Sequence, residues 1–164
     1  MKRIFFLLIC ITVVSCNKNK PDSNSNVNGS IEYKINGTLF SFSNGLVKKV
    51  TGTPGAISTF YLIQGFQGNN SANIFIYTHS DTLKQQSYHL EYGSLPSFTQ
   101  DSKVYTVLDT PDYFIDVLIT SYKNGFVSGT FNGKVTHIIS VNPSKVEDAA
   151  ITDGKFNNLK VFYY

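Results

Sequence analysis

The feature that most limits the fold of this chain is the spacing of its apolar residues from Ile31 onward. Runs rich in Ile, Val, Tyr, Phe and Thr alternate with polar residues, and Gly, Asn or Ser interrupts them about every ten residues. No window keeps apolar residues at the i, i+3, i+4 and i+7 positions of an amphipathic helix. The pattern therefore predicts a single all-β domain over residues 31–164.

Two Asn-Gly pairs mark the clearest turns, because Asn36-Gly37 and Asn124-Gly125 each separate two alternating segments. An Asn-Gly loop favours a hairpin, since both turn residues must take positive φ. The predicted strands are 31–35, 38–42, 46–51, 58–65, 72–78, 87–91, 103–108, 113–119, 127–131, 134–140 and 156–163.

The run from Ser58 to Gln64 is apolar on both faces, which predicts a central strand covered on both sides. Short strands without helices must form two facing sheets or close into a barrel, because a lone sheet leaves one apolar face in water. We therefore expect an antiparallel β-sandwich or flattened barrel of roughly 8–10 strands.

The start of the chain has the anatomy of a secretory signal. Met1-Lys2-Arg3 is followed by apolar residues from Ile4 to Val14 and by a small residue, Ser15. A helix of this length rises only about 16 Å, whereas a bilayer core is about 30 Å thick. Residues 1–15 are therefore predicted to be a signal peptide rather than a membrane-spanning helix.

The segment Val13-Val14-Ser15-Cys16 resembles the lipobox of bacterial lipoproteins. This resemblance implies that Cys16 becomes the lipidated N-terminus and anchors the protein to the outer membrane through its acyl chains, which exceed the two signals needed for stable anchoring. The alternative is an ordinary signal peptide cut after Ser15, with Cys16 incidental. Lys18 and Lys20 stand where acidic export signals are expected, which favours the periplasmic side over the cell surface.

After Cys16, residues 17–30 are rich in Asn and Ser and contain one large apolar residue, Val27. Such a segment buries too little apolar area to fold, so residues 16–30 are predicted to be a lipidated, flexible tether. From Ile31 onward ten lysines balance ten acidic residues, which argues against a nucleic-acid partner. The only cysteines are Cys10 and Cys16, so the predicted domain has no disulfide.

Several of these features together resemble a family of small lipoproteins of Bacteroidetes: the lipobox, the Asn-rich tether, the Ile35-Asn36-Gly37 hairpin, the Ser128-Gly129-Thr130-Phe131 strand and the closing strand 151–156. The resemblance implies an envelope-anchored all-β domain, with a lipocalin-like barrel as one form. It transfers no catalytic residue.

The chain holds no G-x-S-x-G, H-E-x-x-H or phosphate-loop motif. His79, His89 and His137 lie in separate segments, and we expect scattered surface histidines rather than a metal site. The densest carboxylates are Asp109, Asp112 and Asp116. Asp112 and Asp116 would lie about 13 Å apart on one strand face, too far for a glycosidase pair, and a charged strand edge is more favoured than a calcium site.

Gly129-Thr-Phe131-Asn and Gly154-Lys-Phe156-Asn share the pattern G-x-F-N. Paired ligand loops are one interpretation. The more favoured one is that each Gly permits a close backbone approach or a bulge while the Phe packs in the core.

These observations favour a non-enzymatic, lipid-anchored β-domain that binds a ligand or partner at the cell envelope, with no catalytic residue, no cofactor and no metal. The first alternative is a lipocalin-like carrier of a small apolar molecule, which requires a cavity lined by Phe and Tyr. The second is an unrecognised hydrolase, which requires Glu91, Asp101 or Asp116 to meet a histidine in one cleft.

Overall fold

The computed structural model describes residues 29–51, 59–78, 82–94, 96–141 and 144–164. The predicted signal peptide, Cys16 and nearly all of the predicted tether lie outside this range.

The predicted all-β class is confirmed. The strands are β1 (Ser30–Ile35), β2 (Thr38–Phe42), β3 (Leu46–Thr51), β4 (Thr59–Gln67), β5 (Asn70–Thr78), β6 (Ser87–Leu90), β7 (Ser97–Gln100), β8 (Lys103–Thr106), β9 (Phe114–Lys123), β10 (Phe126–Val141) and β11 (Ser144–Tyr163), with one 3₁₀ turn, η1 (Tyr92–Ser94).

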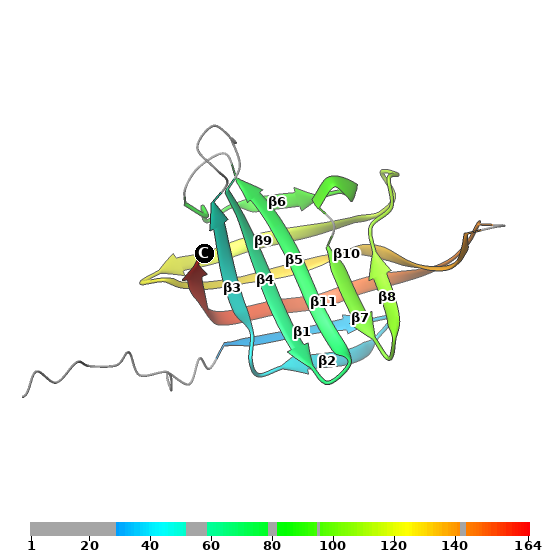
Figure 1. Ribbon diagram of the computed structural model, residues 1–164, viewed down its shortest axis with the longest axis horizontal. Coiled ribbons are helices and arrows are strands. Elements are labelled where there is room, and N and C mark those ends of the chain that lie inside the picture. The colour runs from blue at the N-terminus through cyan, green and yellow to red at the C-terminus, as the bar shows by residue number, and fades with distance from the viewer. Residues whose placement is uncertain (1–28, 52–58, 79–81, 95, 142–143) are drawn as a thin grey trace, which may run out of the picture.

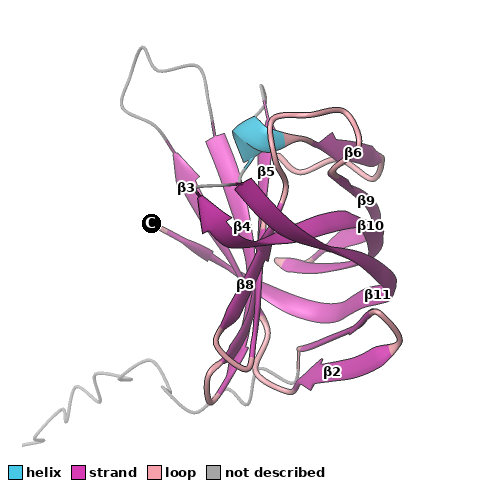
Figure 2. Cartoon of the chain, turned by 90° about the vertical axis from the view of Figure 1, so that its right-hand side faces the viewer, coloured by secondary structure: helices cyan, strands magenta, loops and turns pink. Residues whose placement is uncertain are grey.

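The strands form two layers that cross at a steep angle (Figures 1 and 2). One layer is β2-β1-β11-β10-β9-β6, and the other is β3-β4-β5-β7-β8. Steep crossing is one of the two usual ways in which sheets pack face to face. No helix in the described residues has the length and apolar character needed to cross a membrane.

Hydrogen bonds join the two layers at both sides. The last residues of β11, Lys160 to Tyr163, pair in parallel with Leu46 to Lys49 of β3. On the other side, Thr136 and His137 of β10 pair with β8. The layers therefore close into a flattened barrel, and the β3–β11 pair is its single parallel pairing among the described strands.

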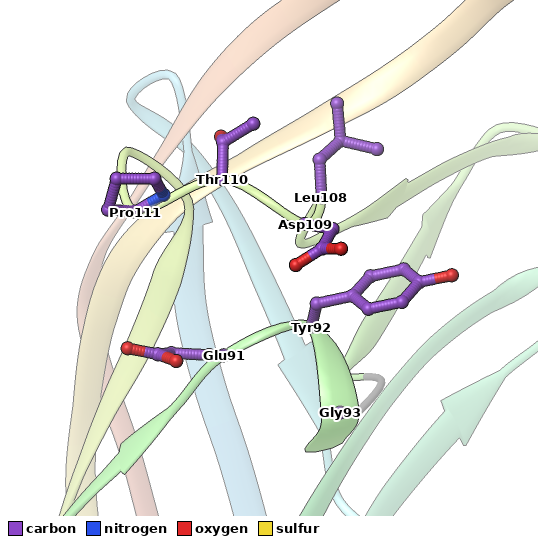
Figure 3. A pocket seen from close by; sticks show the side chains of 7 residues that line it. All are labelled: Glu91, Tyr92, Gly93, Leu108, Asp109, Thr110 and Pro111. Atoms are coloured by element: carbon purple, nitrogen blue, oxygen red, sulfur yellow. The ribbon is translucent and has the colours of Figure 1, made fainter.

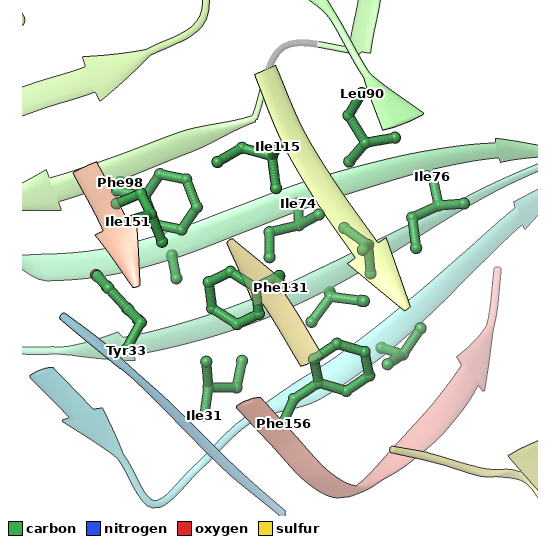
Figure 4. Packing of buried hydrophobic residues seen from close by; sticks show 14 of the residues in the cluster. Ile31, Tyr33, Ile74, Ile76, Leu90, Phe98, Ile115, Phe131, Ile151 and Phe156 are labelled. Carbon is green, nitrogen blue, oxygen red and sulfur yellow. The ribbon is translucent and has the colours of Figure 1, made fainter. Parts of the chain in front are cut away.

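The space between the layers is filled by apolar side chains (Figure 4). Tyr33, Phe98, Phe131 and Phe156 are at most 1 % exposed. The rings of Phe98 and Phe131 stack with their centroids 6.0 Å apart, and Tyr33 meets the Phe98 ring edge-on at 5.2 Å. The buried apolar side chains of the described residues extend from Ile31 to Val161.

Both Asn-Gly pairs form the predicted hairpin turns. The φ angles are 48° and 85° at Asn36 and Gly37, and 55° and 75° at Asn124 and Gly125. These turns place Ile35 opposite Thr38 and Lys123 opposite Phe126. A turn of this kind follows from two adjacent residues, which explains why the sequence identifies it.

The two G-x-F-N segments lie opposite each other in the β10–β11 ladder. Gly129 pairs with Phe156, and Phe131 pairs with Gly154. A methyl group at either glycine would collide with the ring of the opposite phenylalanine and with a neighbouring carbonyl oxygen. Each glycine therefore makes room for the phenylalanine of the other segment, and the close-approach interpretation is confirmed.

The structure corrects three details of the predicted strands. Segments 127–131 and 134–140 form one strand, β10, because Gly133 brings β10 close to Phe114 and Ile115 instead of making a turn. Strand β11 begins at Ser144 rather than near 156. Strand β7 was not predicted, since Phe98 is its only apolar residue.

The expectation that the strand at 58–65 is covered on both sides is wrong. Strand β4 is central in its layer, between β3 and β5. Tyr61 and Ile63 are fully buried in the core, whereas Phe60 and Leu62 on the opposite face are only half-buried. No second layer within the described chain covers that outer face.

Candidate functional site

Polar side chains gather on the outer face of the layer formed by β6, β9 and β10. Strand register makes His89 of β6 the direct neighbour of Asp116 of β9, and Asp116 in turn the neighbour of Asn132 of β10. One step along the ladder, Ser87, Leu118 and Thr130 form a parallel row. Buried Ile115 and Val117 alternate with these residues, so period-two patterning turns the polar set outward.

These two rows border a surface depression of about 410 Å³, here called the polar groove. It is lined by Ser87, Asp116, Val117, Leu118, Thr130 and Asn132. No hydrogen bond between described residues uses the side chains of Ser87, Thr130 or Asn132. The groove therefore presents two hydroxyls and an amide that are free to bind a ligand.

Asp116 at one wall of the groove is fixed by His89. The Nδ1 atom of His89 lies 2.6 Å from Asp116 Oδ1, and its Nε2 lies 3.5 Å from Glu91 Oε1. The imidazole ring also stacks on Phe114, with centroids 5.2 Å apart. Two carboxylates and one aromatic face thus hold a histidine whose side chain is 52 % exposed.

This arrangement brings together the groups required by the hydrolase hypothesis, His89 with Asp116 and Glu91, but in an unsuitable order. A catalytic histidine uses one ring nitrogen for an orienting carboxylate and directs the other to a nucleophile or substrate. Here a carboxylate lies beside each nitrogen. We interpret the cluster as a clamp that orients Asp116.

Glu91 connects this cluster to a second, smaller depression of about 270 Å³ (Figure 3). Its lining comes from η1 and from the loop after β8, and includes Glu91, Tyr92, Asp109 and Thr110. Figure 3 shows the carboxylate of Asp109 beside the Tyr92 ring, whereas the Glu91 side chain extends in the opposite direction from that ring. Asp112 does not line this depression.

The remaining predicted candidates are spread over the domain. His137 lies on β10, where its Nδ1 is 3.0 Å from the carbonyl oxygen of Val104. Asp101 occupies the β7–β8 turn with a φ of 46°, and His79 is outside the described residues. Within the described ranges, no three His, Cys, Asp or Glu side chains are grouped as metal ligands.

A charged cluster formed by Tyr113, Lys134 and Asp148 joins β10 to β11. Tyr113 Oη donates a hydrogen bond of 2.6 Å to Asp148, and Lys134 Nζ lies 3.0 Å from the same carboxylate. The hydrogen bond from Tyr113, followed by that from Lys134, lowers the pKa of Asp148 below its usual value. The Lys134 ammonium also lies 5.0 Å from the centre of the Tyr113 ring.

Sequence reasoning singled out His89, Glu91 and Asp116 but missed Ser87, Thr130 and Asn132. Their outward direction is visible in the period-two pattern. The pattern does not show that these side chains lie close together, because their proximity depends on the register between β6, β9 and β10.

We compared the chain with protein-family models, curated proteins and solved structures, and found no match in any of the three comparisons.

Proposed function

We propose that this protein is a lipid-anchored binding protein of the cell envelope, whose β-domain holds a hydroxyl-rich ligand such as a saccharide in the polar groove without reacting with it. The observation that carries the proposal is the grouping of three unpartnered polar side chains with an oriented carboxylate. Ser87, Thr130 and Asn132 offer both donors and acceptors, and Asp116 offers strong acceptors. Alternating donors and acceptors are what a sugar hydroxyl requires.

Rigidity supports the same interpretation. The groove rests on three neighbouring strands, and His89 holds Asp116 from the side. A site on regular strands keeps its geometry better than one on loops, and a preorganised site loses less entropy on binding.

The other two hypotheses receive less support. A carrier needs an internal cavity, whereas Tyr33, Phe98, Phe131 and Phe156 fill the space between the layers, and the polar groove opens on the surface. The hydrolase hypothesis, in which a carboxylate meets a histidine, needs the second ring nitrogen to face a nucleophile or substrate, whereas carboxylates lie beside both nitrogens of His89.

The ligand proposal is tested by titrating the protein with a panel of neutral oligosaccharides and following backbone amide signals by NMR. We expect shifts at Asp116, Thr130 and Asn132 for at least one sugar. Asn132→Ala should weaken that binding about tenfold, since a lost hydrogen bond in a binding site costs about 1–1.5 kcal/mol.

The matched control is Thr99→Ala, which removes a hydroxyl from β7, outside the residues that line the groove. Its sugar affinity should equal that of the unaltered protein. Shifts only with a short basic peptide would show that the groove recognises cations through Asp116. The absence of shifts with every sugar would reject the ligand class.

The anchor has its own test. Cys16→Ala should remove incorporation of labelled fatty acid and leave the precursor uncut, because the thiol is the acceptor in the lipobox chemistry. Normal labelling of that variant would overturn the anchor.

The expected position of the domain, on the periplasmic side of the outer membrane, is tested by protease treatment of intact cells. The resemblance to Bacteroidetes lipoproteins supports a position in the cell envelope.

A further inference from the structure

The uncovered outer face of β4 belongs to a larger surface that is both apolar and basic. Cross-strand neighbours on one side of a sheet share a face. One row of neighbours is Phe162, Lys48, Leu62 and Phe75, taken from β11, β3, β4 and β5. The next row continues with Val50, Phe60 and Tyr77, and Tyr77 is 48 % exposed.

The same face continues across β11, which pairs with β3 on one side and with β10 on the other, to the β9–β10 hairpin. Lys160 pairs with Leu46 on one side and with Phe126 on the other, and Phe126 pairs with Lys123. We name the combined surface the lysine–aromatic face. It consists of Leu46, Lys48, Val50, Phe60, Leu62, Phe75, Tyr77, Lys123, Phe126, Lys160, Phe162 and Tyr164.

Two of the three lysines of this face, Lys48 and Lys160, lie over aromatic rings rather than beside carboxylates. Lys160 Nζ is 5.5 Å from the centre of the Phe162 ring, and Lys48 Nζ is 5.9 Å from that of Tyr164. None of the ion pairs formed between described residues includes Lys48, Lys123 or Lys160; the basic partners in those pairs are Lys34, His89, Lys103, Lys134 and Lys155. The face therefore carries uncompensated positive charge, although positive and negative residues balance from Ile31 onward.

A depression of about 360 Å³ lies at one end of the face. It is lined by Ser121, Lys123, Asn124, Phe126, Ser128 and Asn158. An ammonium, hydroxyls and amides beside a phenylalanine can hold a phosphate group while an apolar ring contacts the carbon chain next to it.

The chain enters the domain at this same end. The carbonyl oxygen of Gly29 accepts a hydrogen bond of 3.0 Å from the amide of Gly45, the residue before β3, and Ser30 pairs with Asn157. The twelve residues between Cys16 and Gly29 cannot span more than about 45 Å even when fully extended. A lipid on Cys16 would therefore keep this end of the barrel near the bilayer.

We propose that the lysine–aromatic face docks on the anionic phospholipid surface of the membrane that holds the anchor, with a headgroup phosphate in the Lys123 depression. Aromatic rings and lysines with apolar stems suit the boundary between headgroups and acyl chains. The inference rests on the proposed lipid anchor for its geometry. It also gives the outer face of β4 a cover that the described residues do not provide.

The test uses residues 17–164 without acyl chains, so that vesicle binding is measured independently of lipidation. The probes are vesicles of phosphatidylcholine alone and vesicles rich in phosphatidylglycerol, separated by sedimentation. We expect binding only to the anionic vesicles, with affinity falling as salt is added. Because each lysine near an anionic surface contributes about fivefold in affinity, Lys123→Gln with Lys160→Gln should weaken binding about 25-fold.

The matched control is Lys145→Gln, which removes the same charge from the far end of β11 and should leave vesicle binding unchanged. Equal binding to both kinds of vesicle, an unaltered double variant, or saturation of the depression by inorganic phosphate without vesicle binding would each overturn the docking proposal. Failure of the anchor would appear separately, as lost fatty-acid labelling at Cys16 while residues 17–164 still bind anionic vesicles.

Discussion

Two glycines and two phenylalanines decide how closely β10 and β11 approach each other. Gly154 lies opposite Phe131, and Gly129 lies opposite Phe156, while the two rings stack with centroids 6.4 Å apart. The ring of each phenylalanine occupies the volume that a side chain on the opposite glycine would take. The repeated G-x-F-N pattern is thus one packing unit made of two halves.

We predict that Gly154→Ala destabilises the domain by about 1–3 kcal/mol, because the added methyl group would force the Phe131 ring or the backbone to move in a packed core. Urea unfolding followed by circular dichroism measures this change. Gly93→Ala is the control, since a methyl group there meets nothing within 4 Å. Equal stability of the two variants would contradict the packing argument.

The sequence identified these glycines as close-approach positions because Gly within a strand has few other structural uses. It also identified the turn residues Asn36 and Asn124, whose conformations depend on adjacent residues alone. It could not identify Asn132 as part of a site. That assignment requires the register of β10 against β9, which no single segment contains.

At the scale of elements, polar side chains help to join the two longest strands, β10 and β11, to each other and to the residue before β9. Tyr113, just before β9, donates a hydrogen bond to Asp148 of β11 across Lys134 of β10. The three groups therefore connect consecutive strands.

We predict that Tyr113→Phe raises the pKa of Asp148 toward its usual value, because the hydrogen bond from Tyr113 is the largest cause of its lowering. A lowered pKa in the folded state favours folding above the unfolded-state pKa, and this contribution is lost as pH falls through the folded-state pKa. The variant should therefore lose less stability between neutral and acidic pH.

NMR titration of the Asp148 carboxyl carbon measures the pKa directly. Tyr88→Phe serves as the control, because the hydroxyl of Tyr88 bonds to the backbone of Lys84 instead. An unchanged Asp148 titration in Tyr113→Phe would refute the assigned cause.

The sequence predicts which segments form strands better than it predicts where the strands end or which of their faces the protein covers. The sequence divides β10 into two strands at Gly133, although this glycine only permits close contact with β9. The apolar outer face of β4 was misjudged because Phe60 and Leu62 were assumed to need a protein layer. The apolar pattern of a strand shows which residues avoid water, but it does not show what packs against them.

At the scale of the molecule, closure of the barrel depends on the short parallel pairing of β11 with β3. Val161 is only 4 % exposed and pairs with Val47, which is fully buried. The sequence could not predict this pairing, because β3 and the end of β11 are more than a hundred residues apart.

We predict that ending the chain after Leu159 destabilises the domain by more than about 2 kcal/mol, since it removes buried Val161 and the β3–β11 hydrogen bonds. Thermal unfolding gives the change, and amide exchange should show loss of protection in β3. Ending the chain after Phe162 is the control, because it removes only Tyr163 and Tyr164, which are 65 % and 73 % exposed. Similar stability of both truncations would show that the seam does not hold the barrel closed.

The proposed faces divide the molecule in a consistent way. The polar groove opens from the layer of β6, β9 and β10, and most of the lysine–aromatic face lies on the outer side of β3, β4 and β5. Along β9, Asp116 and Lys123 are separated by about 23 Å. Both depressions lie on the outer side of β9 and β10, so a domain docked at the Lys123 end would hold the groove at a distance along the strands from that contact.

The entry and exit of the described chain both lie beside β3, and this bears on how the barrel could be assembled. Gly29 is bonded to Gly45, and the amide of Tyr164 bonds to the carbonyl of Lys49. Four residues of a strand separate these two bonds, or about 13 Å, a gap that a linker of about five residues can bridge. The barrel is therefore suited to circular permutation, with new ends cut at the Asn124-Gly125 turn, because joining the present ends beside β3 would leave every strand pairing in place.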